Sequence, residues 1–181
     1  MAPFSIDFEW HSAPEYSHLP SEDAAIILDS GSLTSRLKQH SKHFRVDVLQ
    51  EQWIAASDEH KKLLGPNCTQ LQCREVLLVC DDVARVYAQS WISTQASDLG
   101  VRQLGNKPLG EVLFQDKSWQ RSALEVAQVN EPVGFVPLLK DLLLPEQGMF
   151  ARRRVFTYQD ANIMVCEVFL PKVKHATQFA S

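Results

Sequence analysis

The sequence predicts a single α+β domain over residues 1–181, in which an antiparallel sheet of about six strands is covered on one face by helices. Three observations predict this fold class. Six stretches are apolar or alternate with period two, most follow one another as hairpins, and short capped helical segments lie between them. A doubly wound parallel sheet is not expected, because strands and helices do not alternate regularly along the chain.

Two helices are predicted before the first strand, after an N-terminal extension of residues 1–20. The segment PSEDAAIILDSG has Ser21 as a helix N-cap, acidic residues in the first turn, an apolar stripe and Gly31 after its end. The segment SLTSRLKQHSKH begins a second helix at Ser32. The two short helices are therefore expected to adjoin across one glycine.

A strand, a helix and a hairpin are predicted next. FRVDVLQ alternates apolar and polar residues and predicts a strand, and SDEHKKLLGP predicts a short capped helix that ends at Gly65. In LQCREVLLVCDDVARVYAQSWIST two apolar runs are joined through Asp81 and Asp82. This pattern indicates a β-hairpin whose tip lies at the two acids.

The remaining residues predict two helical pieces and three strands. LGVRQLGNKPLGEVLFQD, with its glycines and proline, favours two helical pieces around a tight turn. WQRSALEVAQV, RRRVFTYQD and NIMVCEVFLP predict strands, the last two joined across residues 159–162. Residues 130–151 form a proline-bounded insertion that is expected to hold a small helix.

Composition excludes several classes of partner. The chain is 45% hydrophobic and 22% charged, with a net charge of -4, which gives no electrostatic reason to expect nucleic acid or an anionic membrane. The N-terminus has no signal-peptide pattern, and no apolar stretch approaches a membrane span. We therefore expect a cytoplasmic protein without stable membrane insertion, and a monomer by default.

Cysteines and histidines give no metal-site pattern. The four cysteines lie mostly inside apolar strand patterns without C-x-x-C spacing, which favours reduced core residues. The six histidines have polar or flexible neighbours, and only His40 and His43 share a helical face. We expect neither a metal nor a cofactor.

Glu167 is the most unusual charge in the sequence, because it lies in the middle of the apolar run IMVCEVFLP. In a strand buried on both faces, a lone carboxylate must find a partner or take up a proton. Arg74, at the head of another apolar strand, is the candidate partner. The residues alone leave three alternatives open, namely a shared pocket, a plain ion pair, or an Arg74 that lies in solvent.

Several ordered motifs resemble one family. They are LLVC after CRE, the stretch LGNKPLGEVLF, RRRVF and CEVFLP, preceded by a weaker match at SLTSRL. Together they run from Ser32 to Pro171, and on them the chain resembles the chorismate lyase (chorismate pyruvate-lyase) family. The resemblance implies a six-stranded antiparallel sheet with helices on one face and a ligand buried beneath two helical flaps.

For function, the resemblance implies a carbon–oxygen lyase that converts chorismate to 4-hydroxybenzoate and pyruvate without a cofactor, the first step of ubiquinone biosynthesis. It places Arg74 and Glu167 at the two ends of the aromatic product as the catalytic residues, with backbone contacts from Leu33 and Leu109. The sequence agrees with the backbone contacts, because both leucines follow a helix start, where free N–H groups attract an anion.

The expected mechanism follows from these residues. Arg74 fixes the ring carboxylate, while Glu167, kept protonated by burial, donates a hydrogen bond or a proton at the departing ether oxygen. Flaps that exclude water must reopen before the product leaves, so slow product release is expected.

One departure from the family pattern concerns the second hairpin strand. Where the family usually has an arginine, this chain is interpreted to have Gln89, which could hydrogen-bond a carboxylate but could not neutralise it. Arg152 or Arg153 could meet the second carboxylate of the substrate, although exposure to solvent is the favoured interpretation for both.

The alternative function is a non-catalytic binding protein for a small aromatic acid. The same fold serves as the effector-binding domain of some bacterial transcription regulators, but this chain has no DNA-binding helix-turn-helix pattern and no basic patch. Gln89 is the feature that favours this alternative. A structural protein with only an Arg74–Glu167 ion pair is the third interpretation.

Overall fold

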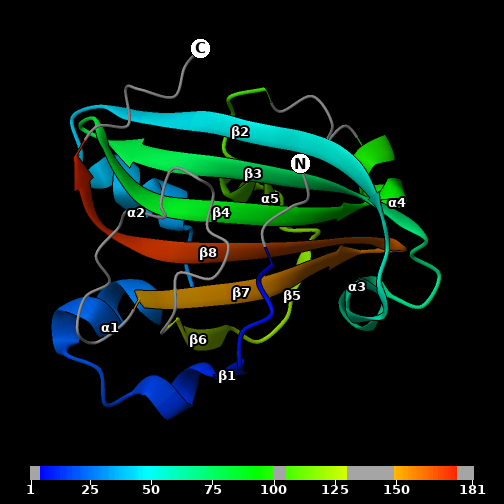
Figure 1. Ribbon diagram of the computed structural model, residues 1–181, viewed down its shortest axis with the longest axis horizontal. Helices are drawn as coiled ribbons and strands as arrows, with labels where there is room; N and C mark the ends of the chain where they lie inside the picture. The colour runs from blue at the N-terminus through cyan, green and yellow to red at the C-terminus, as the bar shows by residue number, and fades with distance from the viewer. Residues whose placement is uncertain (1–4, 100–104, 130–148, 175–181) are drawn as a thin grey trace.

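The predicted α+β class is confirmed, and the antiparallel sheet dominates the molecule (Figure 1). The computed structural model describes residues 5–99, 105–129 and 149–174. In the sheet the strands follow the order β1-β6-β7-β8-β4-β3-β2, and β5 pairs with β7. Because β1 and β5 have two residues each, six long strands remain, as predicted. The strands are β1 (His11–Ser12), β2 (Phe44–Ala55), β3 (Gln70–Cys80), β4 (Val83–Ser93), β5 (Gln120–Arg121), β6 (Glu125–Val129), β7 (Met149–Tyr158) and β8 (Ala161–Lys174).

The helices are short and begin and end close to the predicted residues. The Ser32 hydroxyl caps α2 by accepting a hydrogen bond from the Ser35 N–H at 3.3 Å, and Gly65 ends α3 with φ +100°. The N-cap prediction for α1 is wrong, because Ser21 is its first helical residue and Pro20 occupies the cap position. The helices are η1 (Ala13–Tyr16), α1 (Ser21–Ile27), α2 (Leu33–Gln39), α3 (Asp58–Leu64), α4 (Thr94–Asp98) and α5 (Leu109–Gln115).

The predicted hairpin is confirmed as β3 and β4. Asp81 and Asp82 form its tip with φ of +49° and +62°, the left-handed pair that a tight two-residue hairpin turn requires. The sequence did not predict α4, which follows β4 directly and is capped by the Ser93 side chain.

Two predicted segments fall on residues that lie outside the described chain. These are the first helical piece after residue 99 and most of the insertion at 130–151. The last residues of that insertion, from Met149 on, are described and belong to β7, so the small helix expected there stays a prediction.

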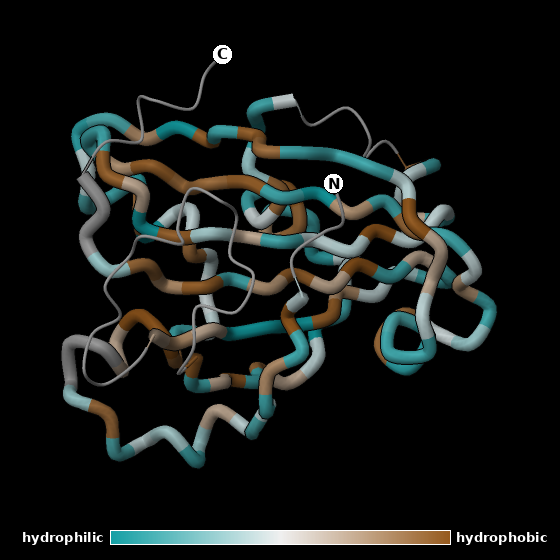
Figure 2. The backbone as a smooth tube through the Cα atoms, viewed as in Figure 1, coloured by the Kyte–Doolittle hydropathy of each residue, from teal (hydrophilic) through white to brown (hydrophobic). Residues whose placement is uncertain are grey.

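The sheet has two differently covered faces (Figures 1 and 2). On one face α2 and α5 pack through Leu33 and Leu109 against apolar side chains of the central strands. The other face is covered by α3 and by the N-terminal segment, which contributes the buried Ile6. Helices therefore cover mainly one face, as predicted, while α3 packs on the other. No helix of the described ranges is long and apolar enough to cross a membrane.

The predicted core cysteines are confirmed as buried free thiols at Cys68, Cys73, Cys80 and Cys166. Burial raises the pKa of the Cys73 and Cys166 thiols well above the ordinary 9.0, and the nearby carboxylates Glu75 and Glu167 add to the effect. Both thiols therefore stay neutral and behave as small apolar side chains.

These thiols predict a loss of stability at alkaline pH. Their folded pKa is raised, so the stabilisation is complete below the unfolded value and falls as pH rises above about 9, by about 1.4 kcal/mol per pH unit for each thiol. Urea unfolding between pH 8 and 10.5 measures this slope. The Cys73→Ala variant should show a smaller slope whatever its absolute stability, and an unchanged slope would contradict the assignment.

Candidate functional site

Strand register places Arg74 and Arg154 on the helix-covered face. Arg74 of β3 pairs with Ser90 of β4, Ser90 with Val165 of β8, and Val165 with Arg154 of β7. Directly paired residues point to the same face, so these four side chains form one row across the sheet. We call this the arginine row.

The neighbouring row on the same face contains Glu167. Two residues along each strand, Val76, Ala88, Glu167 and Arg152 pair in succession. Arg74 and Glu167 therefore lie on the same covered face, as the shared pocket among the three open alternatives requires. One strand, β4, separates them, and its small side chains Ala88 and Ser90 form the floor between them.

The partner of Glu167 is Arg152 and not Arg74. The Arg152 Nε donates to Glu167 Oε2 at 2.6 Å, and the two side chains are only 4% and 16% exposed. Arg152 also donates to the carbonyls of Ile26 and Asp29 at 3.1 and 2.7 Å, and so connects the end of α1 to the sheet. The expected solvent exposure of Arg152 is wrong, because Arg152 is the residue directly opposite Glu167 in the β7–β8 register.

Arg74 is buried but has a different partner from the expected one. Its Nη1 donates to Glu51 Oε1 at 2.6 Å, and its Nη2 donates to the carbonyls of Gly105 and Lys107 at 2.8 and 3.3 Å. Burial lowers the pKa of Arg74, and the Glu51 carboxylate opposes this effect. Arg74 thus holds the residues that lead into α5, at the edge of the site.

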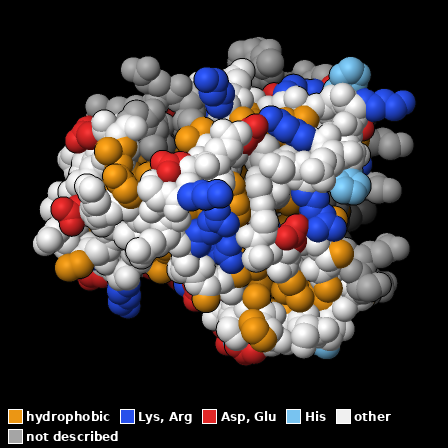
Figure 3. Space-filling view, turned by 180° about the vertical axis from the view of Figure 1, so that it is seen from behind, with side chains coloured by type: hydrophobic (Ala, Val, Ile, Leu, Met, Phe, Trp, Pro, Cys, Tyr) orange, Lys and Arg blue, Asp and Glu red, His pale blue; other side chains and the backbone are white. Residues whose placement is uncertain are grey.

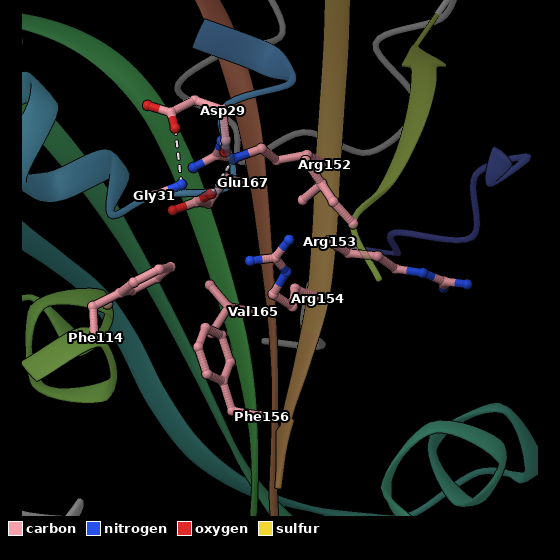
Figure 4. Close-up of a pocket in the computed structure, with 11 residues that line it drawn as sticks. Asp29, Gly31, Phe114, Arg152, Arg153, Arg154, Phe156, Val165 and Glu167 are labelled. Carbon is pink, nitrogen blue, oxygen red and sulfur yellow. Dashed lines mark hydrogen bonds and ion pairs between the residues drawn. The ribbon is translucent and has the colours of Figure 1, made fainter. Parts of the chain in front are cut away.

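A small cavity lies over β7 and β8, next to Glu167 (Figure 4). Its volume is about 30 Å³, which accommodates water but not a substituted benzene ring. Gly31 before α2 and Phe114 of α5 close it from the helix side, while Arg154 and Phe156 line it from the sheet. A ring-sized ligand therefore requires the two helices or the lining side chains to move outward.

The two covering helices contact each other at the surface. Lys38 of α2 and Glu111 of α5 form an ion pair at 2.6 Å, and Gly110 approaches Thr34 closely, since a Cβ on Gly110 would lie 3.5 Å from the Thr34 Oγ1. The expected backbone donors Leu33 and Leu109 are the first residues of α2 and α5, and both side chains are buried. At Leu33 and Leu109, therefore, the backbone N–H group lies in the first turn of a helix while the side chain packs in the core.

Gln89 is not on this face, so its predicted place in the site is wrong. It lies on the opposite face, where the Trp91 Nε1 donates to Gln89 Oε1 at 2.8 Å and the Gln89 amide donates to the Tyr87 hydroxyl at 3.1 Å. Tyr87 in turn donates to the buried Glu75. Strand alternation gives the reason, because the pocket-facing residue next to Arg74 is Ser90.

The sequence interpretation missed Arg154. Arg152 and Arg154 share the face of Glu167, whereas Arg153 points away to Glu125 at 2.7 Å and lies over the Trp10 ring at 4.5 Å. Figure 4 shows the Arg154 guanidinium directed into the cavity and the Arg153 guanidinium directed out of it. The hairpin between RRRVF and CEVFLP pairs Arg152 with Glu167, and alternate residues of a strand share a face. This count could have assigned Arg152 and Arg154 to the face of Glu167 and Arg153 to the other face.

The charges of the site suit a small organic acid. From the helix side, basic side chains gather near the middle of the molecule (Figure 3). Within the described ranges no cluster of three potential metal ligands occurs. The fold and site thus define an α+β domain with a helix-covered, arginine-lined pocket.

Comparison with known proteins identifies the family. The family described as chorismate lyase matches residues 7–178, so this chain belongs to the chorismate lyase family, a family of lyases. A probable chorismate pyruvate-lyase from Pseudoalteromonas translucida is 40% identical and the alignment covers 93% of this chain and 95% of the relative. Another from Idiomarina loihiensis is 36% identical over 93% of this chain and 88% of the relative.

Solved structures show the same fold in regulatory proteins. The effector domain of PhnF from Mycobacterium smegmatis matches with a TM-score of 0.58 at 18% identity, covering 81% of this chain and 96% of that domain. The C-terminal domain of the histidine utilization repressor from Pseudomonas syringae matches with a TM-score of 0.55 at 10% identity, covering 77% and 100%. These likenesses show the fold alone.

The Glu167–Arg152 pair predicts a large and specific loss of stability. Arg152→Ala leaves a largely buried carboxylate without its cation, so we expect about 3 kcal/mol of destabilisation in urea unfolding. Arg45→Ala is the control, because Arg45 makes its ion pairs near the surface and should cost less than about 1 kcal/mol. Equal losses for the two variants would contradict the assignment.

The contacts of Gln89 predict that its substitution lowers stability but leaves ligand affinity nearly unchanged. Gln89→Ala removes the acceptor of the buried Trp91 N–H, so we expect a loss of about 1–3 kcal/mol in the free energy of unfolding. Because the side chain lies on the far face, affinity for an aromatic acid should change less than threefold, as measured by calorimetry. A large loss of affinity at full stability would place Gln89 back in the site.

Proposed function

We propose that this protein converts chorismate to 4-hydroxybenzoate and pyruvate, the entry reaction of ubiquinone biosynthesis. The observation that carries the proposal is the buried Glu167–Arg152 pair beside a helix-covered cavity, on the sheet face that also carries Arg74. Membership of the chorismate lyase family and the relatives named probable chorismate pyruvate-lyase support the same reaction.

The reaction is an elimination whose atoms balance without any co-reactant. The ring carbon that bears the hydroxyl loses its hydrogen as a proton, and that electron pair completes the aromatic ring. The neighbouring carbon–oxygen bond breaks, and its electron pair leaves with the enolpyruvate, which takes up a proton to become pyruvate. The chain must therefore orient the ring, exclude water and move a proton.

Glu167 is proposed to hold the hydroxyl end of the ring. The Arg152 Nε donates to Glu167 Oε2 at 2.6 Å, so Glu167 has a hydrogen-bond donor beside it and does not stand alone as expected. In the proposed roles Glu167 accepts from the ring hydroxyl, or receives the proton from the adjacent carbon, and Arg152 orients it.

Arg74 and two helix starts are proposed to hold the ring carboxylate. Arg74 is 3% exposed and contacts the carbonyls of Gly105 and Lys107, just before α5 begins at Leu109. The first N–H groups of a helix have no intrahelical acceptor, so the amides of Leu33 and Leu109 can donate to an anion near Arg74. Outward movement of α2 and α5 would open the space that the ring needs.

The alternative function is binding of an aromatic acid without chemistry. The fold shared with the PhnF effector domain is the observation that favours it. The two functions differ in their products, because a binding protein would retain chorismate unchanged.

The direct test is incubation of the purified protein with chorismate alone. We expect 4-hydroxybenzoate and pyruvate in equal amounts, with kcat/KM reduced at least a hundredfold in Glu167→Gln, which cannot receive a proton. Arg74→Gln should lose at least tenfold, and Arg45→Gln, which makes the same charge change on β2, should retain activity. Tight binding of 4-hydroxybenzoate without turnover would instead establish the binding protein.

Closure by α2 and α5 also predicts slow product release. Single-turnover formation of 4-hydroxybenzoate in a quenched-flow experiment should be faster than steady-state turnover. Lys38→Gln removes the α2–α5 ion pair and should raise the steady-state rate while leaving the single-turnover rate within twofold. If the two rates are equal in the unmodified protein, release does not limit turnover.

A further inference from the structure

Arg154 is a partly buried cation that lines the cavity and that the roles above leave unused. Its Nη1 donates to the Ser30 carbonyl at 3.0 Å, but its buried Nε has no hydrogen-bond partner among the described residues. Its neighbours Arg152 and Arg153 each hold a carboxylate, at 2.6 and 2.7 Å. Within the described ranges no carboxylate lies within ion-pair distance of Arg154.

The surroundings of Arg154 make this arrangement costly without an anion. Burial lowers the pKa of the Arg154 guanidinium, and the nearby cations Arg152 and Arg121 lower it further, against an opposing effect of Glu167. Asp29, at the rim of the same cavity, is already engaged by the Gly31 N–H and by Arg36, both at 2.8 Å. Arg154 therefore holds a positive charge at the cavity, and the carboxylates of the described residues that line it, Asp29 and Glu167, are engaged with other partners.

The arginine row gives this charge a defined position relative to the proposed substrate. Arg74 and Arg154 stand at opposite ends of the row, three strand spacings or about 14 Å apart at their Cα atoms. Ser90 and Val165 between them carry no charge, so the two guanidinia are the positive charges of the row. A ligand with one carboxylate on its ring and a second on a side group can thus be held between two arginines while Glu167 contacts the ring.

On the pocket face, β4 supplies no positive charge beside Arg74, so the second cation of the row is the one on β7. Chorismate carries one carboxylate on its ring and another on its enolpyruvyl group, and Ser90 on the pocket face of β4 is neutral and buried. Arg154 lies in the same row as Ser90, one strand beyond Val165. The Arg154 guanidinium can therefore supply the positive charge that β4 does not supply.

We propose that Arg154 binds the second carboxylate of a dicarboxylate substrate, the enolpyruvyl carboxylate of chorismate, and so is a specificity-determining residue of the site. This assignment rests on the proposed function. The released aromatic acid has only the ring carboxylate, so Arg154 favours substrate over product. A bidentate guanidinium–carboxylate contact would also satisfy the orphaned Nε.

The test compares a dicarboxylate with a monocarboxylate in the same variant. In Arg154→Gln we expect KM for chorismate to rise at least tenfold, while the Kd of 4-hydroxybenzoate changes less than threefold. Arg154→Lys keeps the charge and should recover part of the affinity for chorismate. Arg153→Gln is the matched control, because its guanidinium points away from the cavity, and it should change neither value more than threefold.

A double variant moves the charge along the row. Adding Ser90→Arg to Arg154→Gln returns a guanidinium to the other side of Val165, and KM for chorismate should fall back by at least fivefold. The assignment would be overturned if Arg154→Gln lost affinity for chorismate and for 4-hydroxybenzoate equally. It would also be overturned if the folded double variant had the same KM for chorismate as Arg154→Gln alone. Urea unfolding confirms that each variant is folded.

The outcome remains informative if the protein does not turn chorismate over. Absence of product in the unmodified protein would contradict the proposed function, and calorimetric Kd values for chorismate and 4-hydroxybenzoate would then replace KM. If Arg154→Gln raised the Kd of chorismate at least tenfold and that of 4-hydroxybenzoate less than threefold, the result would still support Arg154 as the residue that binds the second carboxylate. Absence of this difference would overturn that role independently of the chemistry.

Discussion

The site depends on the register between β7 and β8, which places Arg152 directly opposite Glu167 in the middle of the sheet. A carboxylate in an apolar strand is tolerable only if a cation and further hydrogen bonds accompany it into the interior. Arg152 meets this need and also bonds two carbonyls at the end of α1, so the same guanidinium fixes Glu167 and the segment that enters the cavity. A slip of either strand by one residue would place its charge on the other face and separate the pair.

Because side chains alternate along the strands, the two faces of the sheet carry different sets of polar residues. On the far face, the polar side chains Glu75, Tyr87, Gln89 and Trp91 bond one another, and such networks stabilise a fold when their members find partners. On the helix-covered face, Arg154 has no carboxylate within ion-pair distance among the described residues, and its buried Nε has no hydrogen-bond partner there. The far-face network is bonded within the protein, whereas Arg154 retains a donor for the proposed ligand.

The fold could be predicted from the sequence to a large extent, because its signals are local. The Asp81–Asp82 turn, the Ser32 cap and the period of the strands depend on neighbours in the chain, and each was interpreted correctly. Pairing between distant strands is different. Glu167 was expected to find Arg74, because both are charges in apolar strands, and only the register reveals that Arg152 lies closer. The Gln89 prediction failed by a single residue, which is enough to reverse the face of a strand side chain.

The contrast between Arg152 and Arg154 shows how one basic run can serve stability and binding at once. Both residues lie on the same face two positions apart, yet among the described residues Arg152 has an ion-pair partner and Arg154 has none. A partly buried guanidinium without a carboxylate partner costs stability, since burial lowers its own pKa and the neighbouring cations repel it. In the proposed role, the carboxylate of a ligand supplies the missing negative charge. The electrostatic cost of Arg154 in the protein alone is then the counterpart of the affinity that the proposed site gains when an anion binds.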